Sequence, residues 1–375
     1  METHENKTVM ILANSDSGLY DFRKELLQRL IKEGFRVVVS VPEGNYRERL
    51  IGLGCIYAMT NFNRRGMNPL KDASLFLRYC RLLRKYHPAV VLTYTIKPNI
   101  YGCIACRLKH IPYLVNITGL GMALEQPGRL QTMIVALYRT ALKRAACVFF
   151  QNTYNRNFMI DKKCIFGRSR LISGSGVNLQ EHGMIPYPSE QPEIRLLSVM
   201  RVMRAKGIEE LLYAAPLIKR EYPNVLFEIA GAYEEEERER YEPLIKDLQE
   251  KGVLRYYGYR EDLQQIMAAS HIIVHPSYSE GMSNVLLEAA ATGRPVVASD
   301  IQGCREIMIE GQTGFACQVH DGDALLQAIR RMLSMSPSER GRMGQAGRAQ
   351  VEQHFDRTAV VNIYLDEITD IVSQY

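Results

Sequence analysis

The sequence has no apolar run long enough to cross a membrane, and residues 1–7 lack the pattern of a signal peptide. Cysteine is scarce and scattered. Among eight cysteines in 375 residues, only Cys103 and Cys106 lie close together, and no second pair or histidine cluster accompanies them. This spacing favours a buried helical pair over a metal or redox site, and we expect a protein of the reducing cytoplasm.

Several motifs are also missing. No G-x-G-x-x-G follows the first apolar run at 9–13, which excludes a dinucleotide fingerprint there, and no D-x-D stands in a loop suited to a metal ion. No DNA- or RNA-binding motif is present, so a basic nucleic-acid-binding protein is a low-ranking alternative. We therefore expect no metal, no cofactor and no nucleic acid partner.

The length of the chain, with 46% hydrophobic residues, predicts two domains. Charge is divided unevenly between them. Residues 1–185 hold 27 Lys and Arg against 12 Asp and Glu, whereas the remainder holds 20 against 29. A basic first half predicts contact with an anionic surface, for which anionic lipid and nucleic acid are both candidates.

Apolar runs alternate with helical patterns along most of the chain, which predicts parallel α/β sheets. Linker signals cluster at 187–193, where two prolines stand, so we expect the domains to divide at 187/188. The runs that predict strands are 9–13, 35–40, 89–93, 113–117, 147–151, 194–199, 225–231, 253–258, 271–274 and 295–299.

The stretch 275–293, HPSYSEGMSNVLLEAAATG, joins one predicted strand to a helix that begins near Ser283. Glu280 lies in the loop, and Glu288 lies on the helix one turn after Asn284. The backbone amides of 281–283 stand at a helix N-terminus, which favours an anion. A diphosphate could bind these amides while each carboxylate binds a sugar hydroxyl.

Two basic residues flank a second strand-to-helix turn. Arg201 and Lys206 stand five positions apart, after the strand at 194–199 and before a helix from Ile208. Fixed cations in such a place could stabilise a diphosphate as it leaves a sugar. Residues 62–86 predict a basic amphipathic helix, and 129–144 repeat the pattern. Each is either a core helix with a solvated basic face or a contact to a membrane or an acceptor diphosphate.

These motifs resemble the family 4 retaining glycosyltransferases. Glu280 and Glu288 match the E-x7-E signature, and Arg201 and Lys206 match R-x4-K. The loops TIKPNIYG (95–102) and NITGLG (116–121) look like those of bacterial transferases that build polysaccharide on undecaprenyl diphosphate. The resemblance implies a GT-B fold, in which two Rossmann-like doubly wound domains, 1–187 and 188–356, face each other across a cleft. The helix 357–375 is expected to pack back on the first domain.

The resemblance also implies the site. Catalytic roles fall to Glu280, Arg201 and Lys206, and many relatives carry His where this chain has Thr118 or its neighbours. The residues expected to bind the donor are Gly18, Thr118, Tyr259, Arg260, Gly281, Met282, Ser283, Asn284 and Glu288. The residues expected to bind the acceptor are Asp21, Arg23, Arg64, Lys97 and Asn116.

The function implied is that of a retaining transferase which moves a sugar, expected to be an N-acetylated hexosamine, from a UDP-sugar to a sugar on undecaprenyl diphosphate. It is expected to work in the cytoplasm, on the anionic inner leaflet of the plasma membrane. One alternative is another enzyme of the same fold, such as a UDP-N-acetylglucosamine 2-epimerase. A glycosidase that uses the two carboxylates is disfavoured, because its carboxylates must flank the sugar.

Overall fold

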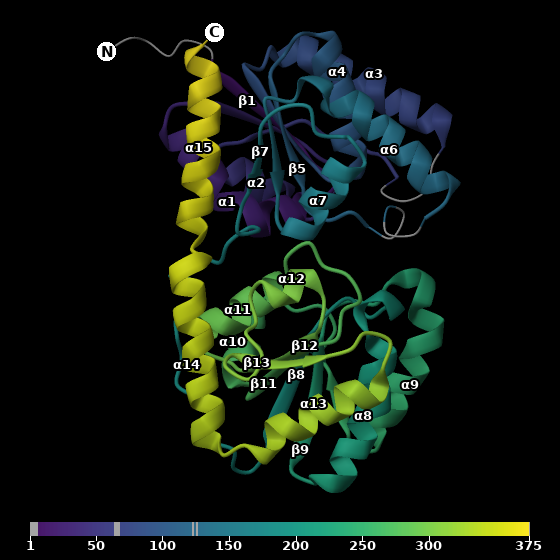
Figure 1. The fold of residues 1–375 in the computed structure, drawn as a ribbon, viewed down its shortest axis with the longest axis vertical. Helices are drawn as coiled ribbons and strands as arrows, with labels where there is room; N and C mark the ends of the chain where they lie inside the picture. Colours follow the sequence, from purple (N-terminus) through teal and green to yellow (C-terminus); the bar gives the residue numbers. More distant parts are fainter. Residues whose placement is uncertain (1–6, 64–67, 122–123, 125–126, 375) are drawn as a thin grey trace. The chain divides into compact units, whose positions relative to one another are not determined.

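A computed structural model describes residues 7–63, 68–121, 124 and 127–374, and its contacts form two compact units (Figure 1). The first unit comprises residues 1–175 and 357–375, and the second comprises 176–356. The expected boundary at 187/188 therefore lies too late in the chain. The reason is that residues 177–187 bond to the second unit: Val177 packs in its core, and the Ile185 amide donates to Thr292 O at 3.2 Å.

The first unit is built on a seven-stranded sheet in the order β3-β2-β1-β4-β5-β6-β7, with all pairs parallel. The chain changes direction between β1 and β4, so the first unit has the doubly wound order with a switch point between these strands. The strands are β1 (Thr8–Leu12), β2 (Arg36–Ser40), β3 (Ile56–Tyr57), β4 (Val90–Tyr94), β5 (Tyr113–Ile117), β6 (Cys147–Phe150) and β7 (Ser169–Leu171).

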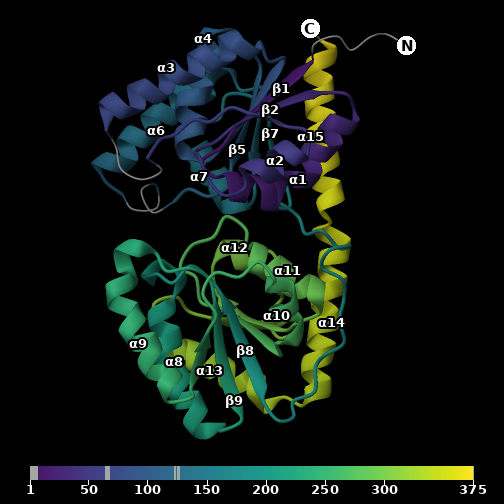
Figure 2. The same cartoon turned by 180° about the vertical axis from the view of Figure 1, so that it is seen from behind.

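Helices cover both faces of this sheet (Figures 1 and 2). One apolar core joins the sheet to α3 (Pro69–Tyr86), α4 (Cys103–Leu108) and α6 (Arg129–Ala141). The other joins it to α1 (Asp16–Lys32), α2 (Arg47–Gly52) and α15 (Arg357–Ser373). The other helices that the structure describes in this unit are η1 (Pro98–Gly102), η2 (Leu142–Arg144) and α7 (Thr153–Asp161).

The second unit repeats the plan with six parallel strands in the order β10-β9-β8-β11-β12-β13. Its switch point lies between β8 and β11, and the loops after these strands leave the same edge of the sheet. Ligands of doubly wound sheets bind at such a place. The strands are β8 (Ile194–Val199), β9 (Val225–Ala230), β10 (Leu254–Tyr256), β11 (Ile272–His275), β12 (Val296–Ser299) and β13 (Gly314–Cys317).

Helices again pack on both faces (Figure 2). One core contains α8 (Ile208–Glu221), α9 (Arg238–Glu250) and α13 (Gly322–Ser334). The other contains α10 (Leu263–Ala269), α11 (Asn284–Thr292), α12 (Gln302–Arg305) and α14 (Pro337–His354). Two short turns, η3 (Arg204–Lys206) and η4 (Glu235–Glu237), complete the unit.

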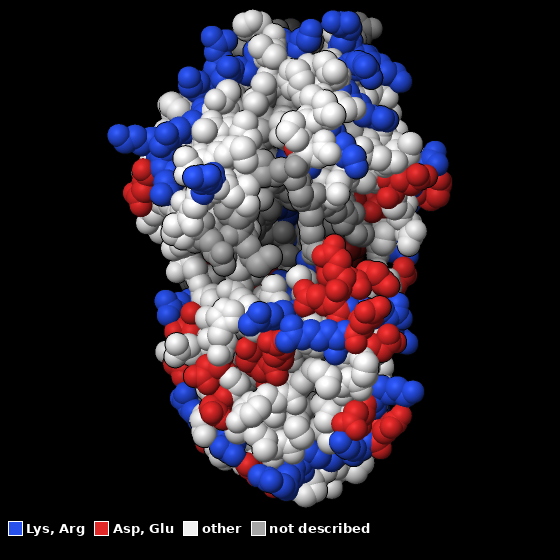
Figure 3. All heavy atoms as spheres, turned by 90° about the vertical axis from the view of Figure 1, so that its right-hand side faces the viewer, with Lys and Arg blue, Asp and Glu red and all other residues white. Residues whose placement is uncertain are grey.

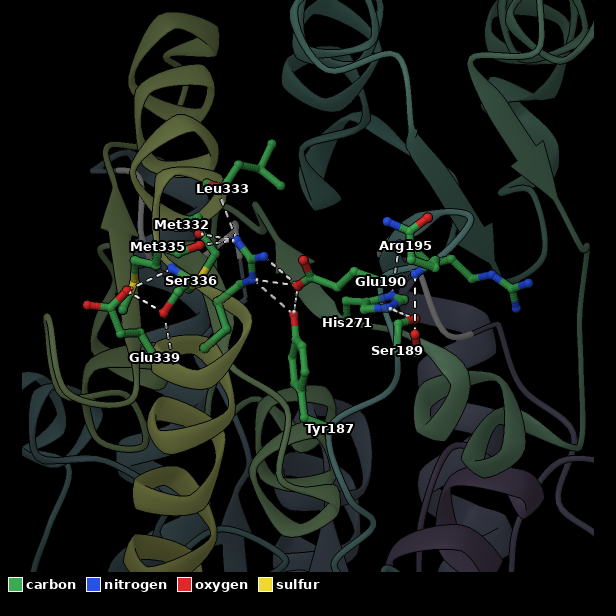
Figure 4. Close-up of polar contacts among 12 residues, drawn as sticks. Tyr187, Ser189, Glu190, Arg195, His271, Met332, Leu333, Met335, Ser336 and Glu339 are labelled. Atoms are coloured by element: carbon green, nitrogen blue, oxygen red, sulfur yellow. Dashed lines mark hydrogen bonds and ion pairs between the residues drawn. The ribbon is translucent and has the colours of Figure 1, made fainter.

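A buried arginine on α14 holds the segment 187–190 in place; Tyr187 and Glu190 of this segment are labelled in Figure 4. Arg340, only 2% exposed, donates from Nε to Glu190 Oε1 at 2.9 Å and to the Tyr187 hydroxyl at 3.0 Å. Its Nη1 donates to three carbonyls at the end of α13, those of Met332, Leu333 and Met335. Because a buried charge needs such partners, the proline-bearing segment is fixed to the second unit rather than acting as a free linker.

Candidate active site

The loop after β8 is held against the loop after β11 by backbone contacts. The Tyr278 amide donates to Ala205 O at 3.1 Å, and Gly207 adopts a φ of +74° at the N-cap of α8. A Cβ on Gly207 would lie 2.1 Å from Pro276 O, so only glycine allows the two loops to approach this closely. The approach brings Lys206, on η3, beside the loop that carries Glu280.

Glu280 is held from the other side by α12. A Cβ on Gly303 would lie 2.5 Å from Glu280 O and 2.8 Å from its Cβ, so the two backbones touch. The Ser283 amide donates to Gly303 O at 3.0 Å, and the Ser283 hydroxyl caps α11 by accepting from the Leu286 amide at 3.3 Å. The predicted start of this helix is confirmed, and Glu280 stands just before it.

Lys206 and Glu280 form an ion pair at the switch point. Lys206 Nζ donates to Glu280 Oε1 at 2.6 Å and lies 3.4 Å from Ser277 Oγ, and both charged side chains are mostly buried. His275 Nε2 lies 3.2 Å from the same Oε1. Burial raises the pKa of Glu280, but the hydrogen bond from His275 and the charge of Lys206 outweigh it and lower the pKa to about 2. Glu280 is therefore ionised at neutral pH.

Arg201 lies in the same loop as Lys206 but binds a different carboxylate. Its side chain is 57% exposed, and Nη1 donates to Glu234 Oε2 at 2.6 Å. The two meet because the loops after β8 and β9 pair through Val202 and Tyr233. An exposed pair of this kind contributes little to stability, so Arg201 can exchange Glu234 for another anion at small cost.

The other residues expected around the donor have different degrees of exposure. Met282 and Ser283 are buried, and the Ser283 amide is already bonded to Gly303, so this amide is not available to a diphosphate. Asn284 and Glu288 share the half-buried side of α11, as expected from their spacing. Gly281 is also half-buried.

The loop after β10 carries the two residues expected at the nucleobase. Tyr259 is exposed, and Arg260 forms a two-pronged pair with Asp262 at 2.7 and 2.6 Å. Both lie at the β10 edge of the sheet. The Gly231 amide, at the end of β9, donates to Gly258 O at 2.8 Å and ties this loop to the rest of the carboxyl edge.

In the first unit, Gly18 and Asp21 belong to the first turns of α1, which begins at Asp16. The Gly18 amide donates to Ser15 Oγ at 3.1 Å, and Asp21 lies on the exposed side of the helix. Thr118 is half-buried and directly follows β5. These residues are at the carboxyl edge of the sheet, where a ligand of this unit is expected.

Three residues expected to bind the acceptor instead make contacts with other residues of the first unit. Arg23 is buried, with its guanidinium carbon 5.0 Å from the ring centroid of Tyr94 and 5.8 Å from that of Tyr364. Asn116 is buried, accepts from the Tyr364 hydroxyl and donates to Thr93 O. Arg23 and Asn116 are thus both buried inside the unit beside α15, where they contact Tyr364, and acceptor binding by either residue stays a prediction.

Lys97, the third, donates to Asp72 Oδ1 at 2.7 Å, and both side chains are largely buried. The Tyr101 hydroxyl donates to the other oxygen of Asp72 at 3.1 Å. This pairing neutralises the charge that was expected to meet an acceptor phosphate. Arg64, the last predicted acceptor residue, lies outside the described residues.

Sequence reasoning missed His275, which contacts Glu280, and Gly207 and Gly303, whose lack of a side chain lets the loops meet. The signal for His275 was a polar ring at the last position of a buried strand, where it follows three apolar residues. The signal for the two glycines was weak, because neither stands in a turn motif that requires a glycine.

Two family models match the chain. The model "Glycosyl transferase 4-like" matches residues 8–152, and the model "Glycosyl transferases group 1" matches 185–350. The second match contains Arg201, Lys206, Glu280 and Glu288.

Curated relatives agree with these matches. The chain is 26% identical over 373 residues to the N,N'-diacetylbacillosaminyl-diphospho-undecaprenol alpha-1,3-N-acetylgalactosaminyltransferase of Campylobacter jejuni, covering 94% of this chain and 96% of the relative. It is 26% identical to the UDP-Gal:alpha-D-GlcNAc-diphosphoundecaprenol alpha-1,3-galactosyltransferase of Escherichia coli, covering 72% of each.

Among solved structures, Anabaena HepE in complex with UDP and glucose superposes with a TM-score of 0.80 at 18% identity, covering 97% of this chain and 100% of HepE. The sucrose-phosphate synthase of Thermosynechococcus elongatus superposes with a TM-score of 0.79 at 20% identity, covering 98% and 100%. The two doubly wound sheets are thus those of the GT-B fold. With a glycosyltransferase 4-like first part and a group 1 second part, the chain belongs to the GT-B glycosyltransferases of family 4 and is a hexosyltransferase.

Proposed function

We propose that this glycosyltransferase moves an N-acetylated hexosamine from a UDP-sugar to a sugar carried on undecaprenyl diphosphate, with retention at the anomeric carbon. The relatives from Campylobacter jejuni and Escherichia coli are both named for acceptors on diphospho-undecaprenol, and the first is named for N-acetylgalactosamine transfer. The two named acceptors carry different sugars. The comparison therefore supports the lipid diphosphate of the acceptor more strongly than any particular acceptor sugar.

The observation that carries the proposal is the Lys206–Glu280 pair at the switch point of the second unit. In our proposal, Lys206 binds the diphosphate of the donor and stabilises the charge that develops on its leaving oxygen. Arg201 adds a second cation by exchanging Glu234 for a phosphate oxygen. Glu280 binds a hydroxyl of the donor sugar, and Glu288 binds the ribose.

Retention follows if the acceptor attacks from the face that the diphosphate leaves. The C1–O bond to the diphosphate breaks, the acceptor oxygen bonds to C1, and the acceptor's proton passes to the leaving diphosphate oxygen. This route needs no protein nucleophile, and Glu280 acts by orienting the sugar. The positive field comes from Lys206 and Arg201, so the proposal requires no metal ion or cofactor.

The proposal also assigns a lipid contact to the outer faces of α3 and α6. On α3, Leu70 (84% exposed) and Leu77 (50% exposed) lie on one side of the helix with Arg81 and Arg84. On the face of the first unit in Figure 3, Lys and Arg predominate over Asp and Glu. Exposed leucine beside arginine suits an interface with anionic lipid. No helix in the described part of the chain is both long and apolar enough to span a bilayer.

A panel of nucleotide sugars tests the donor. UDP-N-acetylhexosamines are expected to raise the melting temperature more than GDP- or ADP-sugars, because a ligand that binds only the folded state stabilises it. The stabilising donor should then transfer its sugar to a synthetic undecaprenyl-diphosphate sugar, with the α-anomer as product and no loss of rate in EDTA. Conversion of the UDP-sugar without any acceptor would instead indicate an epimerase.

Vesicle binding tests the lipid contact. The double change Leu77→Ser and Arg81→Gln is expected to weaken sedimentation with phosphatidylethanolamine–phosphatidylglycerol vesicles at least about fivefold, since one basic residue near an anionic surface contributes about 1 kcal/mol. The matched control is Leu244→Ser with Lys246→Gln, on the exposed side of α9, where the leucine is also 50% exposed. Equal binding by both variants would rule out this face as the lipid contact.

A further inference from the structure

A buried histidine lies directly against the ion pair of the active site. His275 is the last residue of β11 and is 3% exposed. Its Nε2 lies 3.2 Å from Glu280 Oε1 and 3.0 Å from Ser283 Oγ. One imidazole nitrogen thus joins the carboxylate to the residue that caps α11.

The bonding fixes the proton on this ring. An ionised carboxylate only accepts hydrogen bonds, so Nε2 must carry the proton that bonds to Glu280. The Ser283 hydroxyl oxygen shares this N–H in a three-centre arrangement, and it also accepts from the Leu286 amide. His275 is therefore a donor toward Glu280.

The two oxygens of Glu280 are used differently. Oε1 accepts from both Lys206 and His275. No residue in the described parts of the chain bonds to Oε2, and the Glu280 side chain is 17% exposed. Oε2 is therefore the oxygen left for a ligand, and two donors on Oε1 oppose the rotation of the carboxylate group that would exchange the two.

We propose that His275 is a positioning residue, which locks the carboxylate of Glu280 so that Oε2 faces the donor sugar and accepts a hydrogen bond from one of its hydroxyls. This inference rests on the proposed function of the same site. A carboxylate free to rotate would present the oxygen in the wrong place for part of the time, and displacement of a catalytic contact by about 1 Å can lower a rate about 10²-fold.

The chain offers a matched control at the other end of the same strand. His271 directly precedes β11 and is also buried, but it bonds only to backbone groups: Nδ1 accepts from the Arg195 amide at 2.9 Å, and Nε2 lies 2.9 Å from Ser189 O (Figure 4). Removing this ring is expected to destabilise β8 and the segment before it while leaving the contacts of Glu280 unchanged.

The experiment compares His275→Leu, His275→Gln and His271→Leu, with rates corrected for the folded fraction. His275→Leu is expected to lower kcat about 10- to 100-fold with UDP affinity, measured by calorimetry, nearly unchanged. His275→Gln, whose amide nitrogen reaches the place of Nε2, should recover most of this loss. His271→Leu should lower the melting temperature but keep the kcat of the folded protein.

A double-mutant cycle identifies the route of the effect. If His275 acts through Glu280, then His275→Leu should cost nothing further when added to Glu280→Gln. Equal kcat values for His275→Leu and His271→Leu, no recovery in His275→Gln, or additive losses in the cycle would each overturn the inference. A wild-type protein that binds no UDP and transfers no sugar would instead refute the proposed function, so the two failures can be distinguished.

Discussion

Replacing Lys206 by Ala is expected to lower kcat about 10²- to 10³-fold, the range seen when one preorganised donor to a developing negative charge is removed. The ammonium group lies 2.6 Å from Glu280 Oε1 and at the carboxyl edge of β8, so in our proposal it stabilises the leaving diphosphate and also fixes Glu280. UDP affinity should fall as well, because the diphosphate loses a fixed cation. Single-turnover transfer and calorimetry with UDP measure the two effects separately.

Lys219→Ala is the matched control for this change. Lys219 is also half-buried in the second unit, but it lies in the last turn of α8, at the opposite end from Lys206, and donates to Val225 O at 2.9 Å. Because Lys206→Ala leaves Glu280 without its cation, the free energy of unfolding is expected to fall by about 1–3 kcal/mol. The activity assays should therefore be run well below the melting temperature of the variant. A kcat within threefold of wild type, with UDP bound normally, would remove Lys206 from the proposed mechanism.

Adding a single methyl group at Gly303 is expected to be nearly as damaging. The Cβ of Gly303→Ala would lie 2.5 Å from Glu280 O and 2.8 Å from both the Glu280 carbonyl carbon and its Cβ, so the loop that carries Glu280 must move away from α12. We expect a fall in kcat of about 10²-fold, from displacement of the carboxylate. Overpacking of this kind also lowers the free energy of unfolding, by about 1–3 kcal/mol.

The control for Gly303 is Gly183→Ala in the same unit, because nothing lies within 4 Å of a Cβ built there and its φ is not in the left-handed region. That variant should keep both kcat and the unfolding midpoint in urea. If Gly303→Ala is as active as Gly183→Ala, then Glu280 does not need the position that α12 gives it. Transfer assays and urea denaturation decide between these results.

Local sequence signals were sufficient to predict the strands and helix starts of most of the second unit. The bounds of β8, the first residue of α8 and the cap at Ser283 match the sequence predictions. Each of these depends on neighbours a few residues away, such as an apolar run or a capping hydroxyl. Lys206 and Glu280 could be recognised individually for the same reason, since each stands in its own strand-to-helix turn.

Contacts between distant segments were not predictable. Arg23 and Asn116 stand at the carboxyl edge of a sheet and were interpreted as ligand-binding, but Tyr364 is a partner of both, and it is 248 residues from Asn116. The pairing of Arg201 with Glu234 likewise depends on how two loops meet. A single sequence shows which side chains can bond but not which of them a distant helix already occupies.

The position of α15 affects the order in which the two units can be completed during translation. Val360, Tyr364 and Ile368 on this helix fill the first unit's core, although residues 176–356 of the second unit intervene. The ribosome therefore releases every part of the second unit before the helix that covers one face of the first. Until then the part of that face which α1 and α2 leave uncovered is exposed apolar surface, so we expect the nascent amino-terminal unit to be more prone to aggregation than the second unit.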